Sequence, residues 1–231
     1  MNSKLLSAIA AATTATALLG LSAPAQAFSF GTSGIKFTQD TDVKFEFKES
    51  HGAFTSSLGI YSVSDSAIAK VASLFSETKS SDNGGADEWK GTLGNTVLGS
   101  GSTVFTFLAN QVYTLGLSSD NGTVYSTSSL NANSGGSQQA VFGGSGLWNA
   151  LNRETTNVFQ AAGQFTDGTG SLFGGSTLIS FDDRGNDTDA DFQDFTVSAE
   201  AVPEPFTMTG LALGFGGLVA ARRRRANKSA S

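Results

Sequence analysis

The sequence predicts an all-β body that folds as an antiparallel β-sandwich of the jelly-roll type. It also predicts at most one short helix in the body and a helix in each terminal segment. Apolar and polar residues alternate over short runs, which is typical of strands with one buried face. Gly, Ser, Asn and Asp separate these runs at short intervals, as in sandwiches. The three prolines, Pro24, Pro203 and Pro205, all lie outside the body.

The chain divides into a signal peptide (residues 1–27), an exported β-rich domain (28–201) and a C-terminal tail (202–231). At the N-terminus, Lys4 precedes a mostly apolar run, and Ala25 and Ala27 supply the small residues of a cleavage site. This order predicts a secretory signal peptide that is cut after Ala27. A retained membrane anchor is the weaker alternative because three threonines interrupt the apolar run.

Several segments of the body read as strands. Residues 43–47 alternate between apolar and charged side chains, and residues 103–108 and 112–117 form two strands joined at 109–111. Asp120-Asn121-Gly122 predicts a hairpin turn into residues 123–125, because Asn-Gly accepts positive φ. The other predicted strands are residues 58–63, 139–142, 158–165, 177–181 and 192–198.

One segment has helical spacing. Ile68, Val71, Ala72 and Phe75 recur every three or four residues, and the residues just before them offer an N-cap. We therefore expect either one short helix or a further strand at residues 68–75.

The exported domain is strongly acidic and contains no cysteine. The chain has 20 acidic and 14 basic residues, of which one acidic and six basic residues lie in the terminal segments. The domain therefore holds 19 acidic and 8 basic residues, a net charge of −11. This charge argues against nucleic acid or anionic lipid as a partner and is compatible with divalent cations. Without disulfides, the domain must be stabilised by its apolar core, to which 16 of the chain's 18 phenylalanines can contribute, or by metal ions.

Acidic residues concentrate between residues 182 and 194, where six aspartates occur. Carboxylates gathered in this way suit Ca²⁺, which takes six to eight oxygen ligands. The spacing is not that of an EF-hand, because Phe192 stands where Gly is needed and no Glu closes the loop. A solvated acidic turn beside buried phenylalanines is the alternative. The candidate calcium ligands are Asp183, Asp187, Asp189, Asp191 and Asp194.

The same stretch is similar to the Asp-rich signature of secreted bacterial domains of the DUF4114 kind. The matching pieces are Phe181-Asp182-Asp183 and Asp189-Ala190-Asp191-Phe192-Gln193-Asp194, with Gln193 in place of the usual Asn. The resemblance implies a β-rich exported domain and no particular activity.

Two further features allow sugar or cation contact. Residues 81–88 form a second oxygen-rich turn, which is most simply a loop. Trp89, Trp148 and Tyr125 could stack on sugar rings or belong to the core.

The sequence predicts no catalytic activity. His51 is the only histidine, so any Ser-His-Asp site must use it. The chain contains no Gly-x-Ser-x-Gly elbow, no HExxH pattern and no Walker A motif. We therefore expect a protein that is not an enzyme.

The C-terminal tail has three parts in a fixed order. Pro203-Glu204-Pro205 comes first, an uncharged apolar run of sixteen residues (206–221) follows, and Arg222, Arg223, Arg224 and Arg225 end it. The run is slightly shorter than the about 20 residues of a full membrane span. The arginines predict a cytoplasmic C-terminus. A permanent anchor explains the run and the arginines but not the Pro-Glu-Pro step.

This order resembles the PEP-CTERM sorting signal. The resemblance implies an exosortase as processing partner, transient contact with the inner membrane and delivery to the cell envelope, cell surface or medium. It also implies a bacterium that makes exopolysaccharide or biofilm. Two functions are open: a structural or interaction protein of the cell surface or extracellular matrix, and a calcium-dependent module that binds exopolysaccharide or other envelope glycans. Nucleic acid is not an expected partner.

Overall fold

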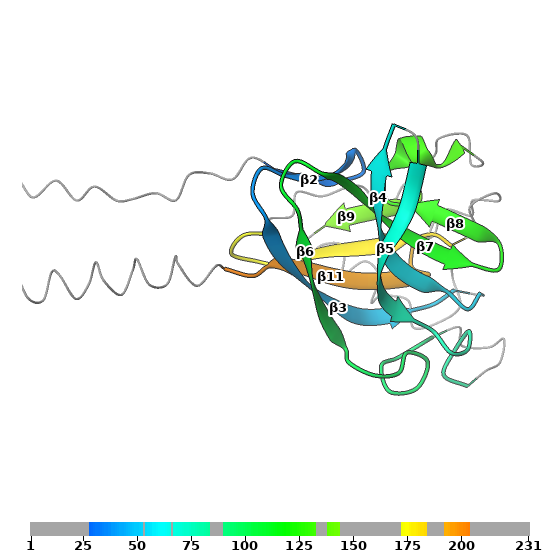
Figure 1. Cartoon of the computed structure of the whole chain (residues 1–231). Helices are drawn as coiled ribbons and strands as arrows, with labels where there is room; N and C mark the ends of the chain where they lie inside the picture. Colours follow the sequence, from blue (N-terminus) through cyan, green and yellow to red (C-terminus); the bar gives the residue numbers. More distant parts are fainter. Residues whose placement is uncertain are drawn as a thin grey trace, which may run out of the picture.

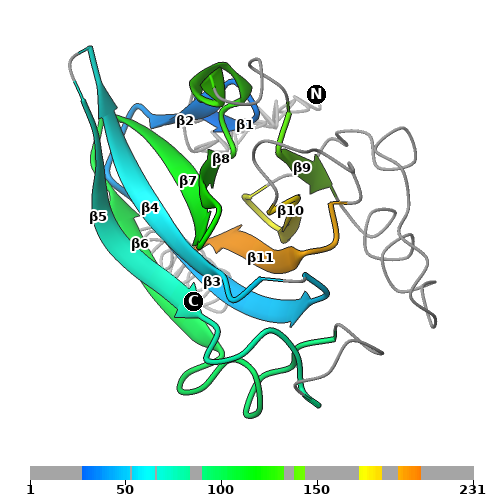
Figure 2. The same ribbon diagram turned by 90° about the vertical axis from the view of Figure 1, so that its right-hand side faces the viewer.

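The computed structural model is all-β, with two antiparallel sheets (Figures 1 and 2). It describes residues 28–52, 54–65, 67–83, 90–132, 138–143, 172–183 and 192–203. The described part contains almost no helix; its named helical element is the 3₁₀ turn η1 (Ser128–Leu130).

The first sheet has the strand order β1-β2-β7-β4-β5, and β8 pairs with the end of β7. Strands β7 and β8 form the hairpin predicted around Asn121-Gly122, and Gly122 has a φ of 117°. The bounds of these strands are β1 Phe28–Gly31, β2 Gly34–Phe37, β4 Ser57–Ser64, β5 Ala67–Ser76, β7 Val112–Ser119 and β8 Gly122–Tyr125.

The second sheet has the strand order β6-β3-β11-β10-β9. Its longest strand, β3, pairs with β6 on one side and with β11 on the other. The bounds of these strands are β3 Thr41–Ser50, β6 Ser102–Phe107, β9 Ala140–Gly143, β10 Thr177–Phe181 and β11 Phe195–Ala201.

One apolar core receives side chains from both sheets. The rings of Phe47 on β3 and Phe75 on β5 lie 6.0 Å apart, and those of Phe30 on β1 and Phe142 on β9 lie 5.6 Å apart. Such aromatic pairs add about 0.5–1.5 kcal/mol each to the free energy gained from area burial. Figure 2 shows β4, β5 and β7 on one side of this core and β3, β10 and β11 on the other.

The short helix expected at residues 68–75 is wrong, and the alternative holds, because these residues belong to strand β5. Register shifts between Leu58 and Gly59 and between Ile60 and Tyr61 of β4 leave extra residues on β5. These extra residues interrupt the regular alternation of the strand. Ile68 and Val71 are exposed whereas Phe75 is buried, so the residues with helical spacing do not share one buried face.

Most predicted strands are confirmed, with shifted ends. Strands β3, β4, β6, β7, β8, β9 and β10 overlap the predicted segments. The predicted strand at 192–198 begins later, since β11 starts at Phe195, and the strand predicted at 158–165 lies outside the described residues. The sequence interpretation missed β1 and β2, whose four residues each are too few for a clear alternation.

The molecule has two distinct ends. At one end β1 begins and β11 finishes, and we call this end the base. At the opposite end β3 and β10 finish and β11 begins, and we call it the acidic end. Strand β3 crosses from the base to the acidic end (Figure 1).

Candidate functional site

The acidic end contains two of the five candidate calcium ligands. Phe181, the last residue of β10, pairs with Phe195, the first residue of β11, so the chain leaves and re-enters the sheet at neighbouring positions. This register brings Asp183 and Asp194 together: the backbone N–H of Asp183 donates to Oδ2 of Asp194 over 2.7 Å. Both aspartates are buried. Asp187, Asp189 and Asp191 lie outside the described residues.

A third carboxylate, that of Glu77, joins these two from the end of β5. Its Oε2 accepts from the backbone N–H of Ser56 over 2.7 Å, and its Oε1 accepts from the Ser50 hydroxyl. The Ser56 hydroxyl donates to Oδ2 of Asp183 over 3.4 Å, so Ser56 bridges the two acids through its backbone N–H and its hydroxyl. Glu77, Asp183 and Asp194 together are called the carboxylate cluster below.

Gly52 allows the chain after β3 to pass beside this cluster. A Cβ at Gly52 would lie 2.7 Å from Oδ2 of Asp183 and 3.2 Å from Cβ of Asp194. The backbone N–H of His51, the preceding residue, donates to the carbonyl oxygen of Asp194 over 3.2 Å. The close approach therefore requires a residue without a side chain.

The charge on Glu77 is poorly stabilised. Burial raises the pKa of Glu77 to about 7, and the nearby charge of Asp183 adds to the increase, although the hydrogen bonds from Ser50 and Ser56 oppose it. Burial of a carboxylate favours its neutral form because solvation is lost. Near neutral pH, Glu77 is therefore present in both protonation states.

A separate ion pair includes the single histidine. His51 Nε2 and Lys90 Nζ each lie 3.3 Å from a carboxylate oxygen of Glu49. Burial opposes ionisation of Glu49, but His51 and Lys90 outweigh it and hold the pKa of Glu49 below its ordinary value. The side chain next to the His51 ring is therefore the carboxylate of Glu49. Among the described residues, no serine hydroxyl forms a hydrogen bond with Nε2 of His51, as a Ser-His-Asp site would require.

The described residues do not by themselves form a metal site. Within them, no group of three or more His, Asp or Glu is arranged to hold a metal ion. Two of the predicted ligands are together, but one carboxylate oxygen of Asp194 already accepts a backbone hydrogen bond. Calcium binding stays a prediction that depends on the remaining aspartates.

The second oxygen-rich turn is held by Asp82. Its carboxylate accepts from the backbone N–H and the hydroxyl of Thr92, over 2.9 and 2.7 Å, and from the hydroxyl of Thr96, over 2.9 Å. Burial opposes ionisation of Asp82, but these hydrogen bonds hold its pKa below the ordinary value. The carboxylate thus ties the loop together. Residues 84–89, with Trp89, lie outside the described residues.

Tyr125 packs against another ring. It lies edge-on to Tyr61, with ring centroids 5.5 Å apart, and the Tyr61 hydroxyl lies 2.9 Å from Oγ of Ser118. A Cβ at Gly116 would lie 2.5 Å from the Tyr61 ring, so this glycine makes room for the pair. Tyr125 is half-buried, and Trp148 lies outside the described residues.

Only the start of the sorting motif is described. Pro203 is exposed, and the backbone N–H of Val202 donates to the carbonyl oxygen of Asp42 over 2.8 Å. The other predicted sorting and cleavage residues, Ala25, Ala27, Glu204, Pro205 and Arg222 to Arg225, lie outside the described residues. Among the helices of the described part, none is long and apolar enough to cross a membrane.

Sequence reasoning missed Ser50, Gly52, Ser56 and Glu77. Ser56 and Asp183 are 127 positions apart in the sequence, and only the strand pairing brings them together. No local motif indicated this contact. No protein-family model, no curated protein and no solved structure matches the chain.

Proposed function

We propose that this chain is an exported cell-surface or extracellular-matrix protein, sorted and processed by an exosortase-type system. Its role is structural or one of interaction, in exopolysaccharide or biofilm material, and it is not catalytic. The proposal extends to the architecture of the body, a jelly-roll-like sandwich.

The limits of the strands support this proposal most directly. All described strands, from β1 at Phe28 to β11 at Ala201, lie inside the predicted exported domain. Removal of the two predicted targeting segments would therefore leave these strands intact. The body that is left buries an apolar core without cysteine, as a protein folding outside the cell without disulfides needs.

Replacement of Pro203, Glu204 and Pro205 by alanine tests the sorting. We expect the variant to accumulate as an unprocessed membrane form in its native host, because the processing enzyme no longer recognises the tail. The intact mass of the wild-type protein from the envelope should match a chain that begins at Phe28 and lacks Arg222 to Arg225. Asp120→Ala, in an exposed hairpin turn, is the control and should be processed normally. Equal processing of the motif variant and wild type would contradict the assignment.

A calcium-dependent glycan-binding module is the second candidate function. The contact between Asp183 and Asp194 favours it, because the loop between them carries the other three candidate ligands. Millimolar Ca²⁺ should then raise the melting temperature of the wild-type body and not that of Asp187→Asn/Asp189→Asn. A glycan array with and without Ca²⁺ tests the recognition step. An unchanged melting temperature and a blank array would rule out this candidate.

A further inference from the structure

Both ends of the body lie together at the base. The ring of Phe28, in β1, lies 5.1 Å from the ring of Phe173. The backbone N–H of Ala201, the last residue of β11, donates to the carbonyl oxygen of Leu172, the residue before Phe173, over 2.8 Å. The two predicted targeting segments thus join the body at the same end.

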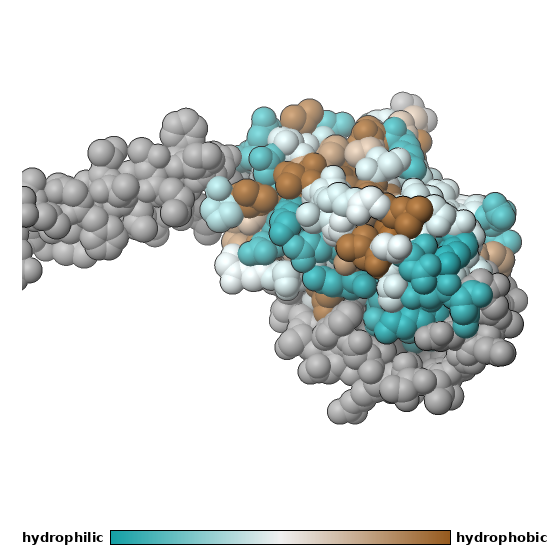
Figure 3. All heavy atoms as spheres, turned by 90° about the horizontal axis from the view of Figure 1, so that it is seen from below, coloured by the Kyte–Doolittle hydropathy of each residue, from teal (hydrophilic) through white to brown (hydrophobic). Residues whose placement is uncertain are grey.

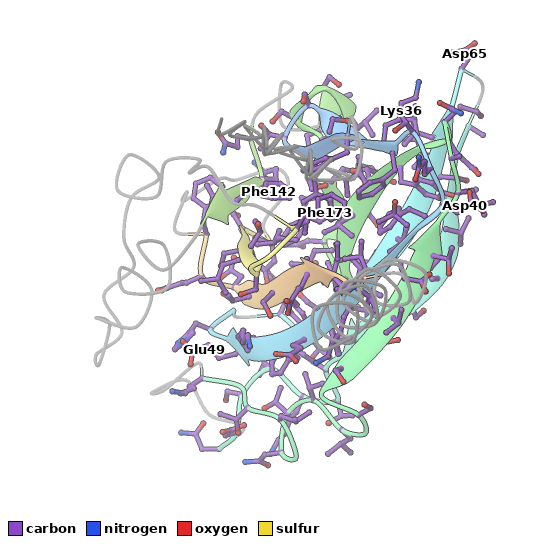
Figure 4. The ribbon with its side chains drawn as sticks, turned by 90° about the vertical axis from the view of Figure 1, so that its left-hand side faces the viewer. Lys36, Asp40, Glu49, Asp65, Phe142 and Phe173 are labelled. Atoms are coloured by element: carbon purple, nitrogen blue, oxygen red, sulfur yellow. The ribbon has the colours of Figure 1, made fainter. Side chains whose placement is uncertain are left out.

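The base carries four large apolar side chains that are exposed. Phe28, Leu108, Phe173 and Val202 keep 39%, 50%, 41% and 38% of their surface exposed. The loop with Leu108 belongs to this end, because the backbone N–H of Asn110 donates to the carbonyl oxygen of Phe37, the partner of Phe28 in the ladder. Figure 4, which views the molecule from the left-hand side of Figure 1, shows Phe173 near the centre and Glu49 of the acidic end at the periphery.

The link to the apolar run is short. Four residues, 202–205, separate Ala201 from the start of the run at Phe206. Val202 is held to Asp42 by its backbone hydrogen bond, so at most three residues, 203–205, can span the distance to the run. Fully extended, three residues reach about 10 Å. The polar layer on each side of a bilayer is about 5–7 Å thick, so the base has little room to move away from it.

The charges of the base favour a neutral lipid surface. Asp40 accepts the backbone N–H of Ala109 at its carboxylate, and Asp42 accepts the hydroxyl of Thr106. Lys36 lies on the neighbouring strand β2. Two acidic residues and one lysine do not attract anionic headgroups, so contact of the apolar side chains with lipid must supply the affinity for the membrane.

We propose that, before the tail is removed, the base lies on the surface of the bilayer, with Phe28, Leu108, Phe173 and Val202 in its interfacial layer. The inference rests on the proposed function in one respect, the insertion of the apolar run into the membrane. The acidic end then points away from the bilayer, and removal of the tail releases the base.

The chain contains no cysteine, so one introduced cysteine can report its position. An environment-sensitive fluorophore is attached to Leu108→Cys at the base or to Leu98→Cys, which replaces a similarly exposed leucine near the acidic end. The signal-processed chain, residues 28–231, is reconstituted into phosphatidylcholine vesicles that contain brominated phosphatidylcholine. We expect several-fold stronger quenching at position 108 than at position 98. Equal quenching at the two positions overturns the inference.

Flotation of the same chain with the vesicles separates this inference from the proposed function. If the chain floats and the two probes are quenched equally, the apolar run inserts but the base does not lie on the bilayer surface. If it does not float, the apolar run does not insert, and the membrane step of both proposals fails. The substitution Phe173→Ser should reduce the quenching at position 108. The control Val104→Ser, at an exposed apolar residue on β6, should leave this quenching unchanged.

Discussion

The base and the acidic end differ in which side chains they expose and which they bury. The base keeps large apolar side chains exposed where the chain enters and leaves the body. The acidic end buries the carboxylates of Glu77, Asp183 and Asp194 and satisfies them with backbone and hydroxyl donors. Figure 3 shows the broadest hydrophilic area on the right-hand side, toward the acidic end. Stability should therefore be far more sensitive to substitution and pH at the acidic end than at the base.

The largest difference is expected for two phenylalanines. Phe195 is fully buried at the acidic end and lies 5.3 Å from the Phe47 ring, whereas Phe28 at the base is partly exposed. Phe195→Ala should lower the free energy of unfolding by about 3–5 kcal/mol because it leaves a cavity. Phe28→Ala should lower it by only about 1 kcal/mol, the typical cost of a single substitution. Urea unfolding of both variants measures the difference, and equal losses would contradict the contrast between the ends.

The pH dependence should be dominated by Glu77. Its pKa is about 7 in the folded protein and 4.5 for a freely solvated glutamate, so the folded state binds the proton more tightly. The protonated carboxyl stabilises the folded state fully below pH 4.5, and this stabilisation is lost as the pH rises through 7. The free energy of unfolding should fall by about 3 kcal/mol in total. Unfolding at pH 5 and pH 8 measures it.

Glu77→Gln is the matched variant for this pH effect, because the amide stays neutral at every pH. It should remove most of the loss of stability between pH 5 and pH 8. Glu46→Gln, on the outer face of β3, should leave that loss unchanged. A wild-type stability that does not fall above pH 6 would show that Glu77 ionises freely.

Two glycines should differ by a smaller amount. A Cβ at Gly52 would meet the buried side chains of Asp183 and Asp194, whereas a Cβ at Gly31 would have no heavy atom within 4 Å. Gly52→Ala should lower the free energy of unfolding by about 1–3 kcal/mol through overpacking. Gly31→Ala should change it by less than about 0.5 kcal/mol. A Gly52→Ala variant as stable as wild type would mean that the chain there relaxes easily.

The smallest effect is expected on the outer face of β3. Hydrogen bonds from Lys44 and Lys48 lower the pKa of Glu46 to about 2. The side chain is 38% exposed, so solvent screening limits the stabilisation to less than about 1 kcal/mol. It is present above pH 4.5 and is lost as the pH falls toward 2. In 1 M NaCl, Glu46→Gln and wild type should unfold at the same urea concentration; a persistent difference would indicate a role beyond the ion pairs.

Local patterns predicted the strands but not the site. Alternation identified β3 because this strand has one buried face, and the Asn-Gly turn identified the β7–β8 hairpin. Alternation failed at β5, where two bulges interrupt it. The proximity of Asp183 and Asp194 could be anticipated from the sequence, since the two residues flank the same connection between predicted strands. The contribution of Glu77 could not be predicted, because its contacts depend on the pairing of β4 with β5 and on the positions at which β3 and β10 end.

The position of β11 has a mechanical consequence. This strand lies between β3 and β10, and its C-terminal residue is joined to the tail while its first residue lies at the acidic end. The hydrogen bonds of antiparallel strands run perpendicular to the strand axis. A pull on Val202 against a load held at the acidic end would therefore act along β11 and strain its hydrogen bonds to both neighbours at once, in shear, instead of opening them one after another.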